Sequence, residues 1–150
     1  MIGWTGDRKE QHLDAPIYST QQLDANDTVF FGSTVGSEEG HYHKTNMHVP
    51  HVLPPGVELR VRYLRFYSDP TTLKLLQRVA FTIVRIVERD MLILPCRLLD
   101  VGEGYLSRQF RVPLILGAEQ SFMVILRMNE QTKRKSLVTA IFEGMMIRPL

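Results

Sequence analysis

The sequence is poor in cysteine, in long hydrophobic runs and in net charge. Its single cysteine, Cys96, excludes a disulfide framework or a cysteine-based zinc cluster within one chain. No hydrophobic run approaches the roughly 20 residues that a membrane-spanning helix requires, and no charged segment followed by a hydrophobic one opens the chain. The formal net charge of +2 at pH 7 is too small to indicate nucleic-acid binding by itself.

Motifs that carry catalysis are also missing. No serine lies in a Gly-x-Ser-x-Gly context, and Gly102-Glu103-Gly104 lacks the third glycine and the following helix of a dinucleotide site. Cys96 lies in a hydrophobic segment, where a thiol is expected to be buried and inert. Glu38 and Glu39 are adjacent and would point apart on an extended chain. We therefore expect no enzymatic activity and no cofactor.

The composition is that of one globular domain. Hydrophobic residues make up 44% and charged residues 23% of the 150 residues, which excludes wholesale disorder. A chain of this length can bury roughly 70% of its unfolded surface without a metal or a disulfide. We expect a single β-domain over residues 28–150, preceded by an extended N-terminal arm at residues 1–27.

Strand signals dominate the expected domain, and helical periodicity is nearly absent. Hydrophobic residues alternate from Val57 to Tyr63, and the alternation slips at Leu64 and Phe66, which indicates a bulge or a change of neighbour. Residues 71–77 read as a short helical turn. Strand candidates span residues 28–32, 57–66, 79–87, 91–99, 108–116, 121–128 and 137–147. Seven or eight strands separated by turn signals predict an all-β fold, best matched by an eight-stranded jelly-roll-like β-sandwich.

The first third of the chain differs in kind from the rest. Residues 1–50 carry three basic and seven acidic residues, a balance of −4, whereas residues 51–150 carry fifteen and nine, a balance of +6. Opposite charges of this kind attract within a chain or between copies, although ordinary scatter of surface charge explains them equally well. Residues 33–55 contain no helical period and form a loop long enough to suggest a specific task.

Two strand candidates are hydrophobic on both faces. In residues 121–128, Met123 and Ile125 oppose the face that carries Phe122 and Val124, and residues 137–147 show the same pattern. A sandwich strand with one solvated face should not be hydrophobic on both. We expect the second face to meet another subunit, the arm folded back, or a partner; cover by the protein's own loops is the structural alternative.

Four of the five histidines fall within eleven residues: His41, His43, His48 and His51. His41 and His43 would project to the same side of an extended segment, which can place two imidazoles on one metal. Cupins, a jelly-roll family, use such a His-x-His pair with a glutamate four or five residues later. Those positions hold Met47 and His48 here, so we predict a solvent-exposed or interface loop and keep the histidines only as candidate metal ligands.

Basic residues form a further candidate surface. Lys133, Arg134 and Lys135 are consecutive in a polar loop, and Arg60 and Arg62 share a strand face. They can contact phosphate or acidic partners, although a solvated hairpin loop and the polar face of an amphipathic strand explain them as well.

Short motifs at both ends of the strand-rich region resemble a known family. Thr45-Asn-Met47, then Val52-Leu-Pro-Pro-Gly56 before the alternating strand, and the closing Phe142-Glu-Gly-Met-Met-Ile-Arg-Pro149 are similar to jelly-roll capsid proteins of tailless, icosahedral bacterial viruses. The resemblance covers the strand pattern from about residue 28 onward. It implies a single-roll bacteriophage virion subunit, as a major, penton (vertex) or minor shell protein, and brings no catalytic residues.

The resemblance implies self-assembly through one sandwich per subunit and an arm that reaches a neighbour. The implied partners are further copies and other virion proteins, contact with packaged nucleic acid or an internal membrane is compatible with this role, and no small-molecule substrate is implied. The implied location is the virion, with a soluble, cytoplasmic chain in the host before assembly. The expected interface residues, as arm anchors and strand entry, are Trp4, Ile17, Tyr18, Phe30 and Phe31. Deletion of residues 1–27 is expected to leave a folded domain that no longer assembles.

Two other function classes stay open. One is a cupin-like metal-binding jelly-roll protein, built on the histidines above. The other is a β-sandwich decoration or receptor-binding module, such as a carbohydrate-recognising domain. Such a module would need an exposed aromatic patch, for which the available rings are Tyr42, Tyr63, Phe66 and Tyr67.

Overall fold

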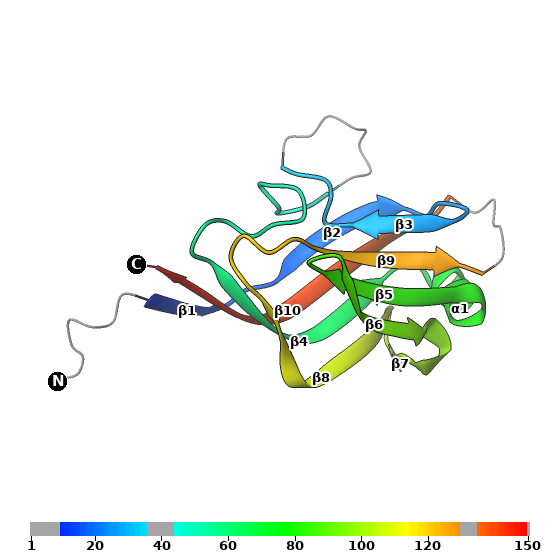
Figure 1. Cartoon of the computed structure of the whole chain (residues 1–150). Helices are drawn as coiled ribbons and strands as arrows, with labels where there is room; N and C mark the ends of the chain where they lie inside the picture. Colours follow the sequence, from blue (N-terminus) through cyan, green and yellow to red (C-terminus); the bar gives the residue numbers. More distant parts are fainter. Residues whose placement is uncertain (1–9, 36–43, 130–134, 150) are drawn as a thin grey trace.

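Two antiparallel sheets pack face to face in the computed structural model, which describes residues 10–35, 44–129 and 135–149. Sheet A has the order β1-β10-β4-β8-β7, with β2 also paired to β10. Sheet B has the order β3-β9-β5-β6. Figure 1 shows the two layers, with helix α1 at one end and β1 at the other. The expected all-β sandwich is confirmed.

Ten strands and one α-helix make up the described part of the chain. The strands are β1 (Glu10–Asp14), β2 (Ile17–Gln22), β3 (Asp27–Phe30), β4 (Glu58–Tyr67), β5 (Ala80–Ile86), β6 (Arg89–Pro95), β7 (Asp100–Gly102), β8 (Tyr105–Leu116), β9 (Phe122–Met128) and β10 (Leu137–Pro149). The helix is α1 (Pro70–Val79), and the 3₁₀ turn η2 (Cys96–Leu98) follows β6. Strands β1, β2 and β7 have no counterpart among the seven strand candidates of the sequence.

Eight of the strands pair in a nested order. Strand β2 pairs with β10, β3 with β9, β4 with β8, and β5 with β6, each antiparallel. The chain therefore behaves as one long hairpin whose successive pairs fall alternately in sheets A and B. Two further ladders, β10 with β4 and β9 with β5, join these pairs into sheets.

The slip of alternation in β4 is a β-bulge, as predicted. The register with β10 shifts between Glu143 and Gly144, and the register with β8 shifts between Val61 and Tyr63. Arg62 is the extra residue, so Leu64 lies inside the sandwich while Tyr63 lies outside. A side chain at Gly144 would collide with the backbone carbonyl of Arg60, which explains why the bulge contains glycine.

Helix α1 extends the expected turn at residues 71–77 by a few residues. Its N-cap is Asp69, whose carboxylate accepts a hydrogen bond from the Thr72 backbone N–H at 2.9 Å, and Pro70 occupies the first turn. Leu73 and Leu76 point into the core, so the helix closes one end of the sandwich. Three leucines, which are not branched at Cβ, and both start signals favour a helix here over another strand.

The strand expected at residues 91–99 begins earlier and ends earlier. Val87 and Glu88 have positive φ angles of 48° and 63°, as the central residues of a tight hairpin turn, so β6 already begins at Arg89. The strand ends at Pro95, whose missing N–H prevents it from continuing the ladder. The chain then turns through η2.

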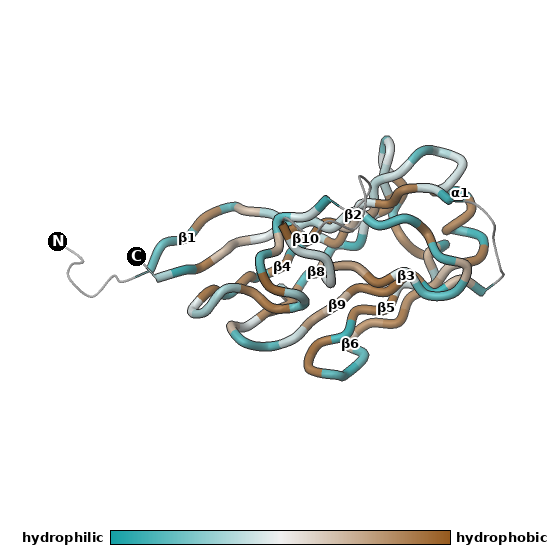
Figure 2. Tube along the Cα trace, turned by 90° about the horizontal axis from the view of Figure 1, so that it is seen from above, coloured by the Kyte–Doolittle hydropathy of each residue, from teal (hydrophilic) through white to brown (hydrophobic). Residues whose placement is uncertain are grey.

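The core lies between the sheets and is centred on phenylalanines. Phe31 stacks on Phe142 with ring centroids 5.3 Å apart and lies 5.6 Å from Phe122. Phe30 lies 5.9 Å from Phe66. All five rings are buried. Figure 2 shows hydrophobic stretches along β5 and β9, the central strands of sheet B.

The N-terminal arm is, from residue 10 onward, part of sheet A. Strand β1 pairs with the end of β10, and β2 pairs with its beginning. Ile17 and Leu23 are buried in the core, and the Ser19 hydroxyl accepts a hydrogen bond from the Phe31 backbone N–H at 3.0 Å. The boundary expected at residue 28 therefore does not separate an arm from a sandwich within the described residues.

Candidate assembly surfaces

The expected interface residues divide between the core and the surface. Ile17, Phe30 and Phe31 are buried within the chain, so their contacts are made to its own core rather than to a neighbour. Tyr18 lies on the outer face of sheet A, opposite Ile141 on β10, and is about one-third exposed. Trp4 lies outside the described residues.

The described histidines do not converge on one site. His48 is exposed, whereas the His51 ring packs against Gly32 and donates from Nδ1 to the carbonyl oxygen of Phe122 at 3.1 Å. His51 thus ties the loop after β3 to the start of β9. His41 and His43 lie outside the described residues. Within residues 10–35, 44–129 and 135–149, no group of three or more metal-ligating side chains comes together.

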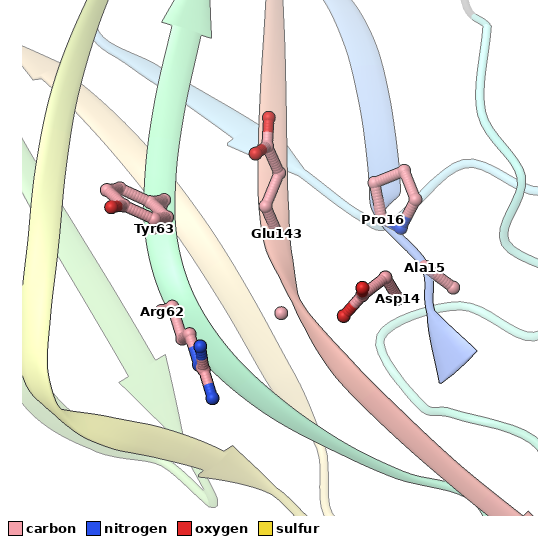
Figure 3. A pocket seen from close by; sticks show the side chains of 7 residues that line it. Asp14, Ala15, Pro16, Arg62, Tyr63 and Glu143 are labelled. Carbon is pink, nitrogen blue, oxygen red and sulfur yellow. The ribbon is translucent and has the colours of Figure 1, made fainter. Parts of the chain in front are cut away.

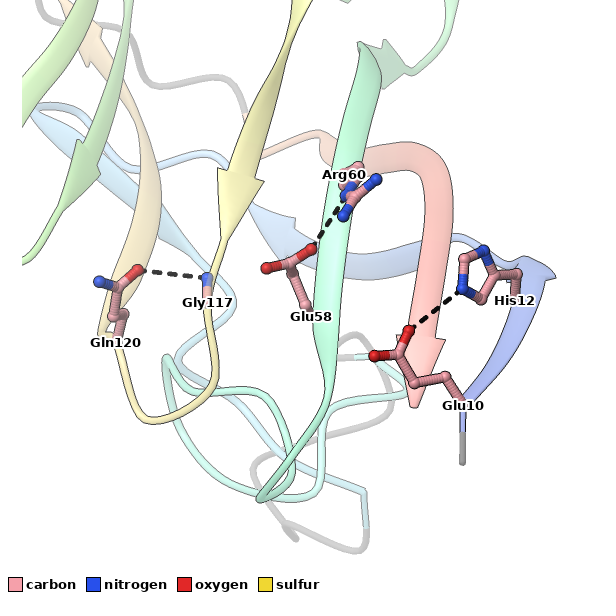
Figure 4. A network of polar contacts seen from close by, with 6 residues as sticks. All are labelled: Glu10, His12, Glu58, Arg60, Gly117 and Gln120. Atoms are coloured by element: carbon pink, nitrogen blue, oxygen red, sulfur yellow. Dashed lines mark hydrogen bonds and ion pairs between the residues drawn. The ribbon is translucent and has the colours of Figure 1, made fainter. Parts of the chain in front are cut away.

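The predicted basic rim is split. Arg60 and Arg62 lie in the first half of β4, and Arg60 is bonded to Glu58 at 2.9 Å (Figure 4). Lys135 is exposed just before β10, near the far end of β4, since Ser68 donates to the carbonyl of Leu137. Seven residues of strand separate the two ends, about 23 Å. Lys133 and Arg134 lie outside the described residues.

The outer face of sheet B carries an aliphatic row across all four strands. Val29, Ile125, Ile83 and Ile93 are consecutive cross-strand partners. Ile83 and Ile125 are only 2% and 3% exposed although neither belongs to the central core cluster. Val29 and Ile93, at the two ends of the row, are 38% and 59% exposed. Hydrophobic side chains thus extend across this face to both edges of the sheet.

Ion pairs lie at two opposite corners of the same face. Arg127 makes a bidentate contact with Asp27, with both N–O distances near 3 Å, and Arg85 contacts Asp90 at 2.7 Å. The hydrogen bond from Arg127 lowers the pKa of Asp27 below its ordinary value. Because each arginine is neutralised by a neighbour on its own chain, the face carries no net charge from these four residues.

The two-sided hydrophobicity of β9 is explained by this face. Phe122, Val124 and Leu126 point into the core, while Met123 and Ile125 point outward. The described arm pairs with sheet A, at β10, and thus does not provide this cover. Strand β10 differs, because its outward residues include the charged Glu143. Glu143 borders a surface rich in tyrosine, which is described next.

The outer face of sheet A is aromatic and polar. Arg65 lies 4.6 Å and 5.2 Å from the ring centroids of Tyr63 and Tyr105, and its guanidinium donates to Glu143 at 2.9 Å. Tyr105 packs on Tyr67 at 5.3 Å. These five residues form the tyrosine cluster. The four rings predicted for an aromatic patch fare differently: Tyr63 and Tyr67 are in the cluster, Tyr42 lies outside the described residues, and Phe66 is a core residue.

A cavity of about 310 Å³ adjoins the tyrosine cluster. It forms where the chain turns from β1 to β2 over the bulge of β4 and β10. Figure 3 shows Arg62 and Asp14 on opposite sides of β10. The residues that line the cavity are Asp14, Ala15, Pro16, Arg62, Tyr63, Glu143 and Gly144. Asp14 from the acidic first third and Arg62 from the basic remainder thus line the same cavity.

Cys96 is buried, as predicted, in η2 rather than in a strand. Its Sγ atom lies 3.2 Å from the Thr82 hydroxyl. Burial raises the pKa of the thiol to about 11, so it is not a nucleophile near neutral pH.

Sequence reasoning missed three of these features. Ile83, Arg65 and Tyr105 were not singled out, because partners in a sheet depend on register rather than on nearby sequence. For Ile125, the hydrophobic residues on both faces of its strand were a signal in the sequence.

No family model matches this chain, and no curated protein is detectably similar to it. Among the described residues, no helix is long and hydrophobic enough to cross a membrane.

Proposed function

We propose that this chain is a self-assembling structural subunit with a single jelly-roll fold, and that it serves as a shell protein of a virion, in a major, vertex or minor position. The observation that carries the proposal is the nested pairing of eight strands, β2 with β10 through β5 with β6. Nested pairing of eight strands in two sheets is typical of jelly rolls, and this supports the proposed fold. Strands β1 and β7 are then additions at the ends of sheet A.

A jelly roll alone does not decide function, since capsid proteins, lectins and cupins share it. The outer face of sheet B favours assembly among these. The exposed ends of the aliphatic row, Val29 and Ile93, are suited to contact with protein, and the ion pairs of this face are satisfied within the chain. The motifs that resemble tailless bacterial virus capsid proteins agree with this role.

The proposed mechanism of assembly is repeated weak contact. Removal of hydrophobic surface from water contributes roughly 25 cal/mol per Å². Charged residues at the rim, such as Arg60, Arg62 and Lys135, would set orientation and choice of partner more than affinity. In a closed shell each contact is repeated many times, so modest interfaces are sufficient.

Imaging of the purified full-length chain tests the proposal. We expect negative-stain electron microscopy to show rings or shell-like particles of uniform size, formed reversibly as salt and protein concentration change. Uniformly small single particles in all conditions would contradict a shell role.

One observation favours a second candidate, a carbohydrate-binding decoration module. The tyrosine cluster presents three half-buried rings beside a cavity, an arrangement that suits sugar rings with polar hydroxyls. Chemical-shift changes during titration with oligosaccharides would map to Tyr63 and Tyr105 in that case. The Tyr105→Ala chain should then lose binding while Tyr18→Ala, on the same sheet but outside the cluster, keeps it.

A further inference from the structure

The residues on the outer face of sheet B form a grid that register defines. One line across the sheet is Asp27, Arg127, Phe81 and Pro95. The aliphatic row of Val29, Ile125, Ile83 and Ile93 is the next line. The third line is Met123, Arg85 and Asp90 on β9, β5 and β6.

A rotation by half a turn about an axis perpendicular to the face, through the point midway between Ile83 and Ile125, brings the grid onto itself. The rotation exchanges β9 with β5 and β3 with β6, and it places like residues on like. Under it Ile125 replaces Ile83, Val29 replaces Ile93, Arg127 replaces Arg85, Asp27 replaces Asp90, and Met123 replaces Phe81. Five exchanged pairs thus keep their chemical class, although the strands have unrelated sequences, and only Pro95 has no counterpart in the grid.

We propose that the outer face of sheet B binds the same face of a second copy of this chain, across a two-fold axis that lies in the plane of the face. The inference rests on the proposed function, because it names the partner and the surface for self-association. A two-fold dimer requires a self-complementary surface, in which the contact from residue i to residue j is made twice.

Charges on the face are placed so that two copies do not repel. With the axis along the strands, Arg127 meets Phe81 of the second copy and Arg85 meets Met123. With the axis across the strands, the same two arginines exchange these partners. Arginine therefore faces a ring or a thioether in either case and never another arginine, an arrangement that favours cation–π and sulfur contacts.

The aspartates and the aliphatic row obey the same geometry. With the axis along the strands Asp27 meets Pro95 of the second copy, and with the axis across the strands Asp90 does. In neither arrangement does an aspartate face an aspartate of the second copy. The aliphatic row meets itself through its exposed ends, so that Ile93 meets Val29 or Ile93 of the second copy. Ile83 and Ile125, at the centre of the row, are already buried within the chain and add little new burial. Two sheets that pack face to face stay aligned within about 30°, which keeps these pairs adjacent.

The face is small, and this sets the expected strength. Four strands at about 4.8 Å spacing and five residues at about 3.4 Å give a face of about 19 by 17 Å. Stable complexes bury about 800 Å² on each partner, so one such face supplies a weak contact. We therefore expect a dimer dissociation constant in the micromolar range or above, so the experiment must cover high protein concentrations.

Sedimentation equilibrium of the full chain tests the proposal, with matched lysine variants. Ile93 and Val29 are exposed at opposite ends of the row, so Ile93→Lys and Val29→Lys place a charge in the contact without disturbing the core. Val112→Lys is the control, because Val112 is 84% exposed on β8 of sheet A. Circular dichroism and thermal unfolding establish that each variant folds.

We expect Ile93→Lys and Val29→Lys each to weaken dimer formation at least tenfold, while Val112→Lys matches the wild type. Equal association of all four chains would overturn the face-to-face dimer, as would a wild-type chain that stays monomeric near millimolar concentration. A dimer that Ile93→Lys abolishes, with nothing larger in any condition, supports the dimer and counts against the shell role. Large particles that form equally well from both row variants support the shell role and overturn this dimer.

Discussion

At the scale of single residues, burial decides the chemistry of Cys96. The thiol lies in the core beside Thr82, and burial raises its pKa to about 11 from an ordinary value of 9.0. In the unfolded chain the thiol ionises first, so stability is lost as the pH rises from about 9 to about 11. The loss approaches about 2–3 kcal/mol for a shift of this size.

We therefore expect the wild-type chain to lose more stability between pH 8 and 11 than the Cys96→Ala chain. Urea unfolding at several pH values measures both slopes, and the variant corrects for lysine and tyrosine titration. Native Cys96 should also resist iodoacetamide at pH 8 until urea unfolds the chain. Rapid alkylation of the folded protein would show that the thiol is accessible.

Gly144 shows how a single residue supports the bulge in sheet A. A methyl group there would meet the Arg60 carbonyl, a backbone atom that cannot move alone. We expect Gly144→Ala to destabilise the fold by roughly 2–4 kcal/mol, as overpacked core substitutions do. Gly104→Ala is the matched control, because its site is open and only its φ of +81° opposes alanine, a cost of about 1 kcal/mol. Equal urea midpoints for the two variants would contradict the close approach.

Residue positions on β4 mark where sequence reading succeeded and failed. The alternation from Val57 to Tyr63 and its slip at Leu64 are visible in the sequence, and the bulge is where they indicate. The sequence does not say which residue is extra. Because Arg62 takes that place, Phe66 becomes a core residue and Tyr63 a surface one, the reverse of strict alternation. Tyr63 thus lies where the predicted patch needs it, whereas Phe66 does not.

At the scale of elements, β1 and β2 contribute unequally to the fold. Strand β1 is exposed on alternate residues and pairs with the end of β10. Strand β2 brings Ile17 and Leu23 close to the core and covers the edge of β10 along six residues. Because β2 is part of sheet A, we now expect deletion of residues 1–27 to destabilise the domain.

We expect a chain that lacks residues 1–15 to unfold cooperatively with a small loss of stability. A chain that lacks residues 1–23 should lose several kcal/mol, since each buried aliphatic side chain contributes roughly 1.5–3 kcal/mol and the freed edge of β10 is left unpaired. Thermal unfolding followed by circular dichroism compares the two deletions. Similar midpoints for both would mean that β2 is not part of the stable fold.

Elements were predicted better where local signals agree. Asp69-Pro70 and the leucines that follow mark α1, and the turn before β6 was expected within a residue or two. Strands β1 and β2 were missed because residues 10–22 are mostly polar. A strand that pairs along one edge and buries few side chains leaves little hydrophobic pattern to detect.

At the scale of the whole molecule, the all-β sandwich follows from strand count and turn spacing, whereas the surfaces do not. The grid on sheet B brings together β3, β9, β5 and β6, four strands drawn from residues 27 to 128. Its pairing depends on how the long hairpin folds into two layers, which no local pattern contains. The same is true of the tyrosine cluster, where Arg65 meets Glu143 from the far end of the chain.

The central claim is that the chain associates with itself, and its mass in solution tests this most directly. Light scattering of the full-length protein over a wide range of concentration and salt measures that mass. The account predicts a mass that rises with concentration from the 17.3 kDa monomer to at least a dimer, and to larger uniform particles in shell-forming conditions. A constant mass of one chain at every concentration and salt would contradict it.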